Sequence, residues 1–231
     1  MKKLFICFSF LLVVFLNACK KDNYKSPDAE LYGNIVDATT GKNVPQQTNV
    51  SGGYLQLFQT DYPKPTAIQT ALHVDGSYTR GFMFSGHYKV VPTGPFFYRD
   101  TLNVNVNGST RLDIKVIPYL TVTSELLSKT AKSITIRVKV TQPAQNTQKI
   151  ARILAVAATF NTVDVNNYNS NRGLTNTEAI DNAVVVNTSY DYTITDLKPG
   201  TLYYVRGGAR TINTGSYYNY APMLMVTTNS Q

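Results

Sequence analysis

Three tyrosines that follow a Thr-Gly-Ser turn, Tyr217, Tyr218 and Tyr220, have the type and spacing that best suit ligand binding. An exposed tyrosine offers a flat apolar face and a hydroxyl at low entropic cost, and the axial C–H faces of sugars stack on such rings. Because side chains alternate along a strand, we expect Tyr218 and Tyr220 on one face and Tyr217 on the other. The alternative is that the tyrosines pair across a sheet as ordinary strand residues.

Polar residues elsewhere in the same half of the chain can supply hydrogen bonds to such a ligand. The further candidates are Tyr168, within the asparagine-rich stretch 166–169, and two arginines, Arg206 and Arg210. The chain has no tryptophan, which weakens the interpretation as a sugar site because indole is the favoured stacking partner.

The sequence contains no constellation that predicts catalysis. His73 and His87 flank a turn, but no third ligand has a suitable spacing, so we expect no metal site. The nucleophile elbow, the zinc-protease motif, the P-loop and the dinucleotide fingerprint are all missing from the sequence. The acidic residues are not paired as glycoside hydrolysis requires. We therefore predict a protein that is not an enzyme and has no cofactor; calcium held by carbonyls remains an alternative.

The composition indicates a folded β protein. The chain has 231 residues, of which 43% are hydrophobic and 16% charged, enough apolar material for packed cores and too little charge for a disordered chain. Two cysteines and two histidines exclude a disulfide framework and a histidine-rich metal site. The net charge of +8 includes no basic run interleaved with aromatic residues, so we expect no nucleic-acid partner.

Residues 1–18 are interpreted as a lipoprotein signal peptide. A short basic start precedes an apolar run over 4–16, which is shorter than the roughly 20 residues of a transmembrane helix. The sequence Leu-Asn-Ala-Cys that ends at Cys19 resembles the lipobox of bacterial lipoproteins. This resemblance implies diacylglycerol on Cys19 and attachment to the outer membrane. The alternative is an ordinary secretory signal with a chance cysteine.

Residues 19–27 form the expected tether. Its Lys-Lys-Asp sequence at 20–22 looks like the short charged signals that send lipoproteins of Bacteroidetes to the cell surface. The resemblance implies display on the surface. The alternatives are a plain solvated tether and a position on the periplasmic face of the membrane.

Residues 28–118 are predicted to form a β-sandwich without a helix. Alternation places Leu31, Gly33 and Ile35 on one strand face, and Asp75-Gly76 predicts a hairpin. The expected strands cover 31–36, 54–58, 68–74, 77–84, 87–91, 102–106 and 112–116. The order of the Leu-x-Gly-x-Ile-Val-Asp, Asp-Gly-x-Tyr and Phe-x-Gly-x-Tyr-x-Val motifs resembles carboxypeptidase-regulatory-like, transthyretin-like (prealbumin-like) modules, which implies a spacer or stalk.

Residues 119–231 are predicted to form a second sandwich, because Pro118 interrupts the strand pattern. We expect strands over 134–140, 150–160, 184–186 and 190–194. A polar loop is expected over 161–176, with a helical turn after it.

The sequence Leu-Lys-Pro-Gly-Thr-Leu-Tyr ending at Tyr203 resembles the signature of fibronectin type III, an immunoglobulin-like fold. The resemblance implies that the Tyr203 hydroxyl bonds back to upstream backbone. Alternation after it predicts Tyr203 facing inward with Val205 and Ala209. Tyr204, Arg206 and Arg210 are expected to face outward.

The predicted fold class is therefore all-β, with two tandem sandwiches after a lipoprotein signal peptide. This order of features resembles a family of two-domain outer membrane lipoproteins of unknown function from Bacteroidetes. The resemblance implies that the protein belongs to a polysaccharide utilisation locus. Such a locus also includes a starch-utilisation-type outer membrane transporter and its glycan-binding lipoprotein.

Two functional hypotheses follow. The first is a non-catalytic, lipid-anchored envelope protein that binds a polysaccharide or serves a polysaccharide uptake system. The second is a structural or assembly lipoprotein that contacts the outer membrane transporter, or another envelope partner, without binding sugar.

Overall fold

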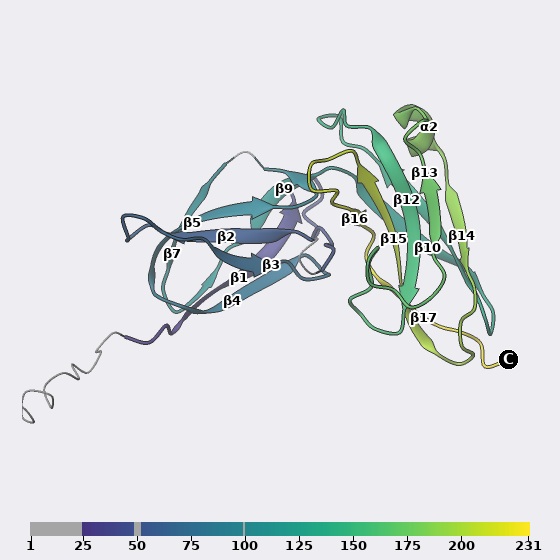
Figure 1. Cartoon of the computed structure of the whole chain (residues 1–231), viewed down its shortest axis with the longest axis horizontal. Helices are drawn as coiled ribbons and strands as arrows, with labels where there is room; N and C mark the ends of the chain where they lie inside the picture. Colours follow the sequence, from purple (N-terminus) through teal and green to yellow (C-terminus); the bar gives the residue numbers. More distant parts are fainter. Residues whose placement is uncertain (1–24, 49–51, 99) are drawn as a thin grey trace, which may run out of the picture.

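The computed structural model describes residues 25–48, 52–98 and 100–231. Nearly all regular structure is β-strand, arranged in four sheets, which confirms the predicted all-β class. Figure 1 shows the sheets as two bodies side by side. Within the described ranges, no helix has the length and apolar character needed to cross a membrane.

The first sandwich, built from residues 29–118, packs two sheets around one core. One sheet has the order β4-β1-β9-β6, with β8 also paired to β1, and the other has the order β3-β2-β5-β7. The strands are β1 (Ala29–Asp37), β2 (Tyr54–Gln59), β3 (Ile68–Ala71), β4 (Ser77–Met83), β5 (Gly86–Thr93), β6 (Phe96–Phe97), β7 (Leu102–Val106), β8 (Ser109–Arg111) and β9 (Ile114–Pro118). Leu31 and Ile35 are buried between the sheets as their alternation predicts.

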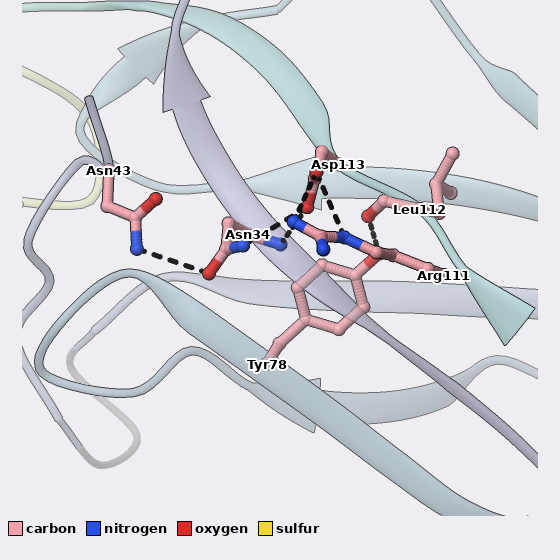
Figure 2. A network of polar contacts seen from close by, with 6 residues as sticks. All are labelled: Asn34, Asn43, Tyr78, Arg111, Leu112 and Asp113. Carbon is pink, nitrogen blue, oxygen red and sulfur yellow. Dashed lines mark hydrogen bonds and ion pairs between the residues drawn. The ribbon is translucent and has the colours of Figure 1, made fainter. Parts of the chain in front are cut away.

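The edge of β1 has two successive partners, β8 along its first half and β9 along its second. Between them, the Asn34 N–H is bound not by a backbone carbonyl but by Asp113 Oδ1 at 3.0 Å (Figure 2). Arg111 Nη2 donates to the other carboxylate oxygen at 2.9 Å. Burial alone would raise the pKa of Asp113, but the hydrogen bonds from Arg111 and Asn34 outweigh it and lower that pKa. The Asp113 carboxylate thus accepts the hydrogen bond that a backbone carbonyl of a neighbouring strand would otherwise accept.

Gly33 lies at the same break, where the chain between β8 and β9 comes closest to β1. A Cβ on Gly33 would lie 2.0 Å from the carbonyl oxygen of Leu112. The same carbonyl accepts a hydrogen bond from Tyr78 Oη at 2.5 Å, and Asn43 Nδ2 donates to Asn34 Oδ1 at 3.1 Å (Figure 2). This crowded backbone has no space for a side chain.

We expect Gly33→Ala to lower the free energy of unfolding by about 1–3 kcal/mol, because two backbone segments must separate to admit the methyl group. Urea unfolding of the variant measures this loss. Gly81→Ala is the matched control, since a Cβ there meets nothing within 4 Å, and a change within about 0.5 kcal/mol is expected. Equal losses in the two variants would contradict the steric explanation.

The hairpin predicted at Asp75-Gly76 does not form, because the strands before and after this turn do not pair with each other. The turn itself forms, with Gly76 at φ 84°. However, β3 before the turn pairs with β2, whereas β4 after it pairs with β1 in the other sheet. The turn residues therefore set a local reversal of the chain, and packing of the two sheets decides which strands pair.

The second sandwich, built from residues 121–227, contains a three-stranded sheet of order β10-β11-β14 and a sheet of order β13-β12-β15-β16 with β17 also paired to β15. Its elements are β10 (Thr121–Lys129), β11 (Ile134–Thr141), β12 (Ile150–Ala158), β13 (Gly173–Asn176), α2 (Asn182–Asn187), β14 (Tyr190–Ile194), β15 (Leu202–Thr211), β16 (Asn219–Tyr220) and β17 (Leu224–Thr227). Its core is separate from that of the first sandwich.

The tyrosine corner forms as the fibronectin-like resemblance implies. The Lys198 N–H donates to Tyr203 Oη at 2.9 Å. Tyr203, Val205 and Ala209 are buried in the main core, which confirms the predicted inward face of β15.

The region between β12 and β14 differs from prediction. Residues 184–186, expected as a strand, lie in α2, and the helical turn begins after Asp181. Residues 173–176, expected as loop, form β13 and pair with β12. Burial of Val185 in the main core stabilises the helix despite the weak helix propensity of valine.

The second face of the β12–β15 sheet is also covered. Leu154, Val156 and Ala158 pack there in a separate apolar cluster with Val163 from the following loop. The sequence of β12 is a nearly continuous apolar run because both faces of this strand are buried.

Candidate functional site

The predicted ligand-binding tyrosines separate into two groups in the structure. Tyr218 and Tyr220 share one face, as expected, but they are only 4% and 2% exposed. Their rings lie 6.1 Å apart within the apolar cluster on the second face of the β12–β15 sheet. The Val165 N–H donates to Tyr220 Oη at 3.0 Å. The expectation of an exposed tyrosine pair is therefore wrong, because the 160–168 segment covers this face.

Arg206 also departs from expectation. Its side chain points away from the main core, as predicted, but it is completely buried at the junction of the two sandwiches. The guanidinium lies 4.3 Å from the centre of the Tyr220 ring. Nη1 donates to the carbonyls of Gln46 at 3.0 Å and Val163 at 3.3 Å. Arg206 thus fastens the sandwiches together and is not available to a ligand.

Arg210 and Tyr168 lie at the margin of the same cluster. Arg210 is half-buried, with its guanidinium 5.6 Å from the Tyr218 ring. Tyr168 packs partly against the cluster and stacks under Arg172 at 5.2 Å. The nearby asparagine-rich stretch bonds largely to its own loop, for example Asn169 Nδ2 to Thr159 Oγ1 at 2.9 Å. These residues shape the cover of the sheet.

Tyr217, which lies in the segment between the Thr214-Gly215 turn and β16, lines a cavity at the junction that we call the tyrosine cleft. Its volume is about 270 Å³. The first sandwich contributes Phe96 and Tyr98, the segment between the sandwiches contributes Tyr119, and the second sandwich contributes Tyr217. The polar lining includes Thr93, Gln148, Asn213 and Thr214. Of the six predicted residues, Tyr217 lines this cleft, whereas Tyr220 lines a separate cavity at the junction with Asp37 and Leu120.

The backbone around Tyr217 fixes its ring. Asn213 brackets the residue, since Asn213 Nδ2 donates to the Tyr217 carbonyl at 3.0 Å and Asn213 Oδ1 accepts from the Tyr217 N–H at 2.9 Å. A Cβ on Gly215 would lie 1.9 Å from the Tyr217 ring, so the ring packs directly on glycine backbone. Tyr119 is held by an edge-to-face contact with Phe97 at 4.7 Å. The aromatic walls are therefore preorganised.

Burial keeps the tyrosine hydroxyls of the cleft protonated. It raises the pKa of Tyr98, Tyr119 and Tyr217. The Tyr98 hydroxyl is buried without a hydrogen-bond partner among the described residues. At neutral pH the cleft thus presents apolar ring faces beside neutral O–H and amide groups, a combination suited to an uncharged polyhydroxylated ligand.

A second cavity at the junction, the wide cleft, has a volume of about 680 Å³. His73, Asp75 and Ser77 lie at its wall, but their bonding does not suit catalysis. Ser77 Oγ donates to Asp75 Oδ1 at 2.7 Å, while His73 Nδ1 lies 3.0 Å from Ser77 Oγ. A nucleophilic serine needs the histidine as its proton acceptor and the carboxylate behind the histidine. Here the Asp75 carboxylate accepts the hydrogen bond from the serine hydroxyl.

The two histidines lie at different sites. His73 pairs with Ser77, and His87 Nδ1 lies 3.0 Å from Asp61 Oδ1. In the part of the chain that the structure describes, no group of three or more metal-ligating side chains comes together. Cys19, the predicted lipidation site, lies outside the described residues.

Several residues of the tyrosine cleft were missed as ligand candidates. Phe96 and Tyr98 follow a Gly-Pro turn, and Tyr119 directly follows the boundary proline. The available signal was their position beside the domain boundary, since ligand sites often form between domains.

Comparison with known proteins places the first sandwich in context. Residues 29–117 match the family model described as Protein of unknown function (DUF3823) N-terminal domain. No curated protein matches the chain.

Solved structures share the fold of both sandwiches. A DUF3823 family protein from Bacteroides uniformis superposes with a TM-score of 0.75 at 18% identity, covering 87% of this chain and all of the other. A second B. uniformis protein, described as a "putative carbohydrate binding protein", gives 0.71 at 24% identity over 87% of this chain and 99% of its own. A DUF3823 family protein from Parabacteroides merdae gives 0.72 at 20% identity over 88% and 100%. These comparisons indicate no catalytic family.

Proposed function

We propose that this protein is a non-catalytic, lipid-anchored outer membrane protein that binds a carbohydrate in the tyrosine cleft. The observation that carries the proposal is the geometry of that cleft, where rings from both sandwiches surround neutral hydroxyl and amide groups. The carbohydrate-binding description of one protein with the same fold supports this class of ligand.

The chemistry of the cleft fits a sugar better than a charged metabolite. The C–H faces of a pyranose pack on tyrosine rings such as that of Tyr217, which Asn213 and Gly215 hold in place. Gln148, Asn213 and Thr214 line the same space and offer both donors and acceptors to sugar hydroxyls. Among the described residues that line the cleft, there is no Lys, Arg, Asp or Glu side chain that would select an ionic ligand.

For location, we propose that diacylglycerol on Cys19 attaches the protein to the outer membrane and that the protein is displayed at the cell surface. There it would act beside the transporter of a glycan uptake system. The support is the lipobox and the charged tether in the sequence. The second candidate function is an assembly lipoprotein that binds no sugar. It is favoured by the burial of Tyr218, Tyr220 and Arg206, which commits most of the aromatic cluster to internal packing.

We expect Tyr217→Ala to weaken binding to the recognised polysaccharide about tenfold, the effect of losing a contact of about 1.4 kcal/mol. The measurement is affinity electrophoresis of the full chain, purified from membranes in detergent, through gels that contain a panel of polysaccharides. Tyr217→Phe keeps the ring and should retain most of the affinity. Tyr62→Ala, at an exposed tyrosine far from the junction, is the matched control and should migrate as the wild type does.

Retardation by one polysaccharide that Tyr217→Ala abolishes, with unchanged thermal unfolding, would establish the cleft as the site. Binding that survives Tyr217→Ala would move the site elsewhere. A complete lack of retardation across the panel would favour the assembly function, for which co-purification with an outer membrane transporter is the next measurement.

A further inference from the structure

We infer that one end of the first sandwich, the aromatic tip formed by Tyr62, Phe82 and Phe84, lies against the lipid surface to which the chain is anchored. This inference rests on the proposed lipid anchor and adds a second contact with the membrane. It does not depend on carbohydrate binding.

The three aromatic side chains are unusually open to solvent. Phe82 is 88% exposed, Tyr62 57% and Phe84 44%. Phe82 also adopts φ 55°, a left-handed conformation that is rare and costly for a bulky residue. Met83 between the phenylalanines is buried in the core. The end of β4 is thus fixed in the core while the phenyl rings on either side of Met83 are exposed.

The tip is a single structural unit. The hydroxyl of Tyr88 donates to the carbonyl of Phe84 at 2.9 Å, which fixes the β4–β5 turn. The turn that carries Tyr62 is tied to the start of β5, because Asp61 Oδ2 accepts from the His87 N–H at 2.8 Å and Asp61 Oδ1 meets the His87 ring. Rigid turns of this kind present the rings without an ordering cost on contact.

The tip lies at the end of the sandwich where the chain enters. Ala29, the first residue of β1, is paired with Met83. From there β1 runs to Asp37, which lines a cavity with Leu120 and Tyr220 at the junction. At about 3.3 Å per residue, the tip is therefore about 25 Å from the second sandwich. Figure 1 shows the purple start of the chain at the end that faces away from the second sandwich.

The preceding chain is short enough to limit the distance between this end of the sandwich and the membrane. Ala29 is the tenth residue after Cys19, and a chain of that length spans at most about 35 Å. A lipid on Cys19 would hold the tip within reach of the headgroups. Phenylalanine and tyrosine are stable at that depth, where rings contact acyl chains and a tyrosine hydroxyl stays hydrated. A lipid surface is therefore the occupant that the chain length and the side chains both favour.

The absence of tryptophan from the sequence allows a direct test. Phe82→Trp introduces one fluorophore at the tip, and Phe84→Trp is a second version in case the first disturbs the turn. The full chain is purified from membranes and reconstituted into phosphatidylethanolamine/phosphatidylglycerol vesicles, with bromine on the acyl chains near the headgroups. Met225→Trp, at a residue 72% exposed on β17 in the second sandwich, is the matched control.

We expect blue-shifted emission and strong quenching by brominated lipid at positions 82 and 84, and neither effect at 225. Mass spectrometry of the N-terminal peptide establishes whether Cys19 carries lipid. Lipidated protein whose tip tryptophans are no more quenched than Trp at 225 overturns the inference and leaves the anchor standing. A blue shift without quenching indicates that the tip contacts protein and also overturns it. Unmodified Cys19 overturns the anchor and this inference together, while the polysaccharide gels still decide carbohydrate binding.

Discussion

Replacement of Arg206 by leucine is expected to lower the free energy of unfolding by about 3–5 kcal/mol and to loosen the junction between the sandwiches. The guanidinium donates to carbonyls from both sandwiches: Gln46 and Val74 in the first, and Val163 in the second. Leucine removes the donor from the buried carbonyls of Gln46 and Val163, whereas the Val74 carbonyl still accepts from the Gln46 N–H. Each unsatisfied group costs about 1–3 kcal/mol.

The charge of Arg206 adds to this effect. Burial lowers its pKa to about 10, so the side chain is still protonated at neutral pH. The buried carboxylate of Asp164 favours the protonated form, and Thr48 Oγ1 donates to that carboxylate at 3.2 Å. Leucine would leave Asp164 in a buried site without this countercharge, which is more costly than losing the contact alone.

Urea unfolding of Arg206→Leu measures the loss, and small-angle X-ray scattering measures whether the two sandwiches move apart. Arg210→Leu is the matched control on the same strand. Its guanidinium lies farther from its tyrosine ring, at 5.6 Å, and a loss of about 1 kcal/mol or less is expected. A similar small loss in Arg206→Leu, with an unchanged scattering profile, would show that Arg206 does not fasten the junction.

The second large effect is expected at alkaline pH, where the folded protein should lose about 3 kcal/mol of stability between neutral pH and pH 11. Burial is the main cause that raises the pKa of Tyr192 to about 12 and the pKa values of Tyr78 and Tyr220 still further. All three side chains are buried in the folded protein.

The direction follows from proton binding. An unfolded tyrosine loses its proton near pH 10.0, whereas these folded tyrosines retain theirs. The unfolded state then binds fewer protons, so this stability is fully present below about pH 10 and is lost as the pH rises toward the folded values, by about 1.4 kcal/mol per tyrosine at pH 11. Arg206 acts in the opposite direction, because burial lowers its pKa to about 10, so the loss of its proton near that pH stabilises the folded state. This gain offsets the destabilisation from about one tyrosine.

Chemical unfolding in a series of alkaline buffers, with tyrosinate absorbance recorded in parallel, checks this expectation. Tyr192→Phe removes one of the linked protons, so its stability should fall less steeply, by about 1.4 kcal/mol less at pH 11. The substitution also removes the hydrogen bond to Thr175, which lowers stability at every pH. Stability that stays level to pH 11 would mean that the buried tyrosines ionise without unfolding.

The sequence by itself determined the fold class and the orientation of side chains along individual strands. Alternation places Leu31 and Ile35 on the buried face of β1, and it places Val205 on the buried face of β15. The resemblance carried by the signature that ends at Tyr203 implies a bond from its hydroxyl to upstream backbone, and the structure has that bond at the Lys198 N–H. These features depend on strand pleating and on contacts between neighbouring residues, which a short stretch of sequence contains.

Only the tertiary structure decided what covers each face and which strands pair. The turn at Asp75-Gly76 joins two sheets because β1 and β2 offer partners far away in the sequence. Tyr220 and Arg206 were expected at a surface and are buried, because the 160–168 segment and the first sandwich close over them. Alternation with a period of two residues predicts which side chains share one face of a strand. Whether that face is buried depends on what packs against it, and this is decided by residues far away in the sequence.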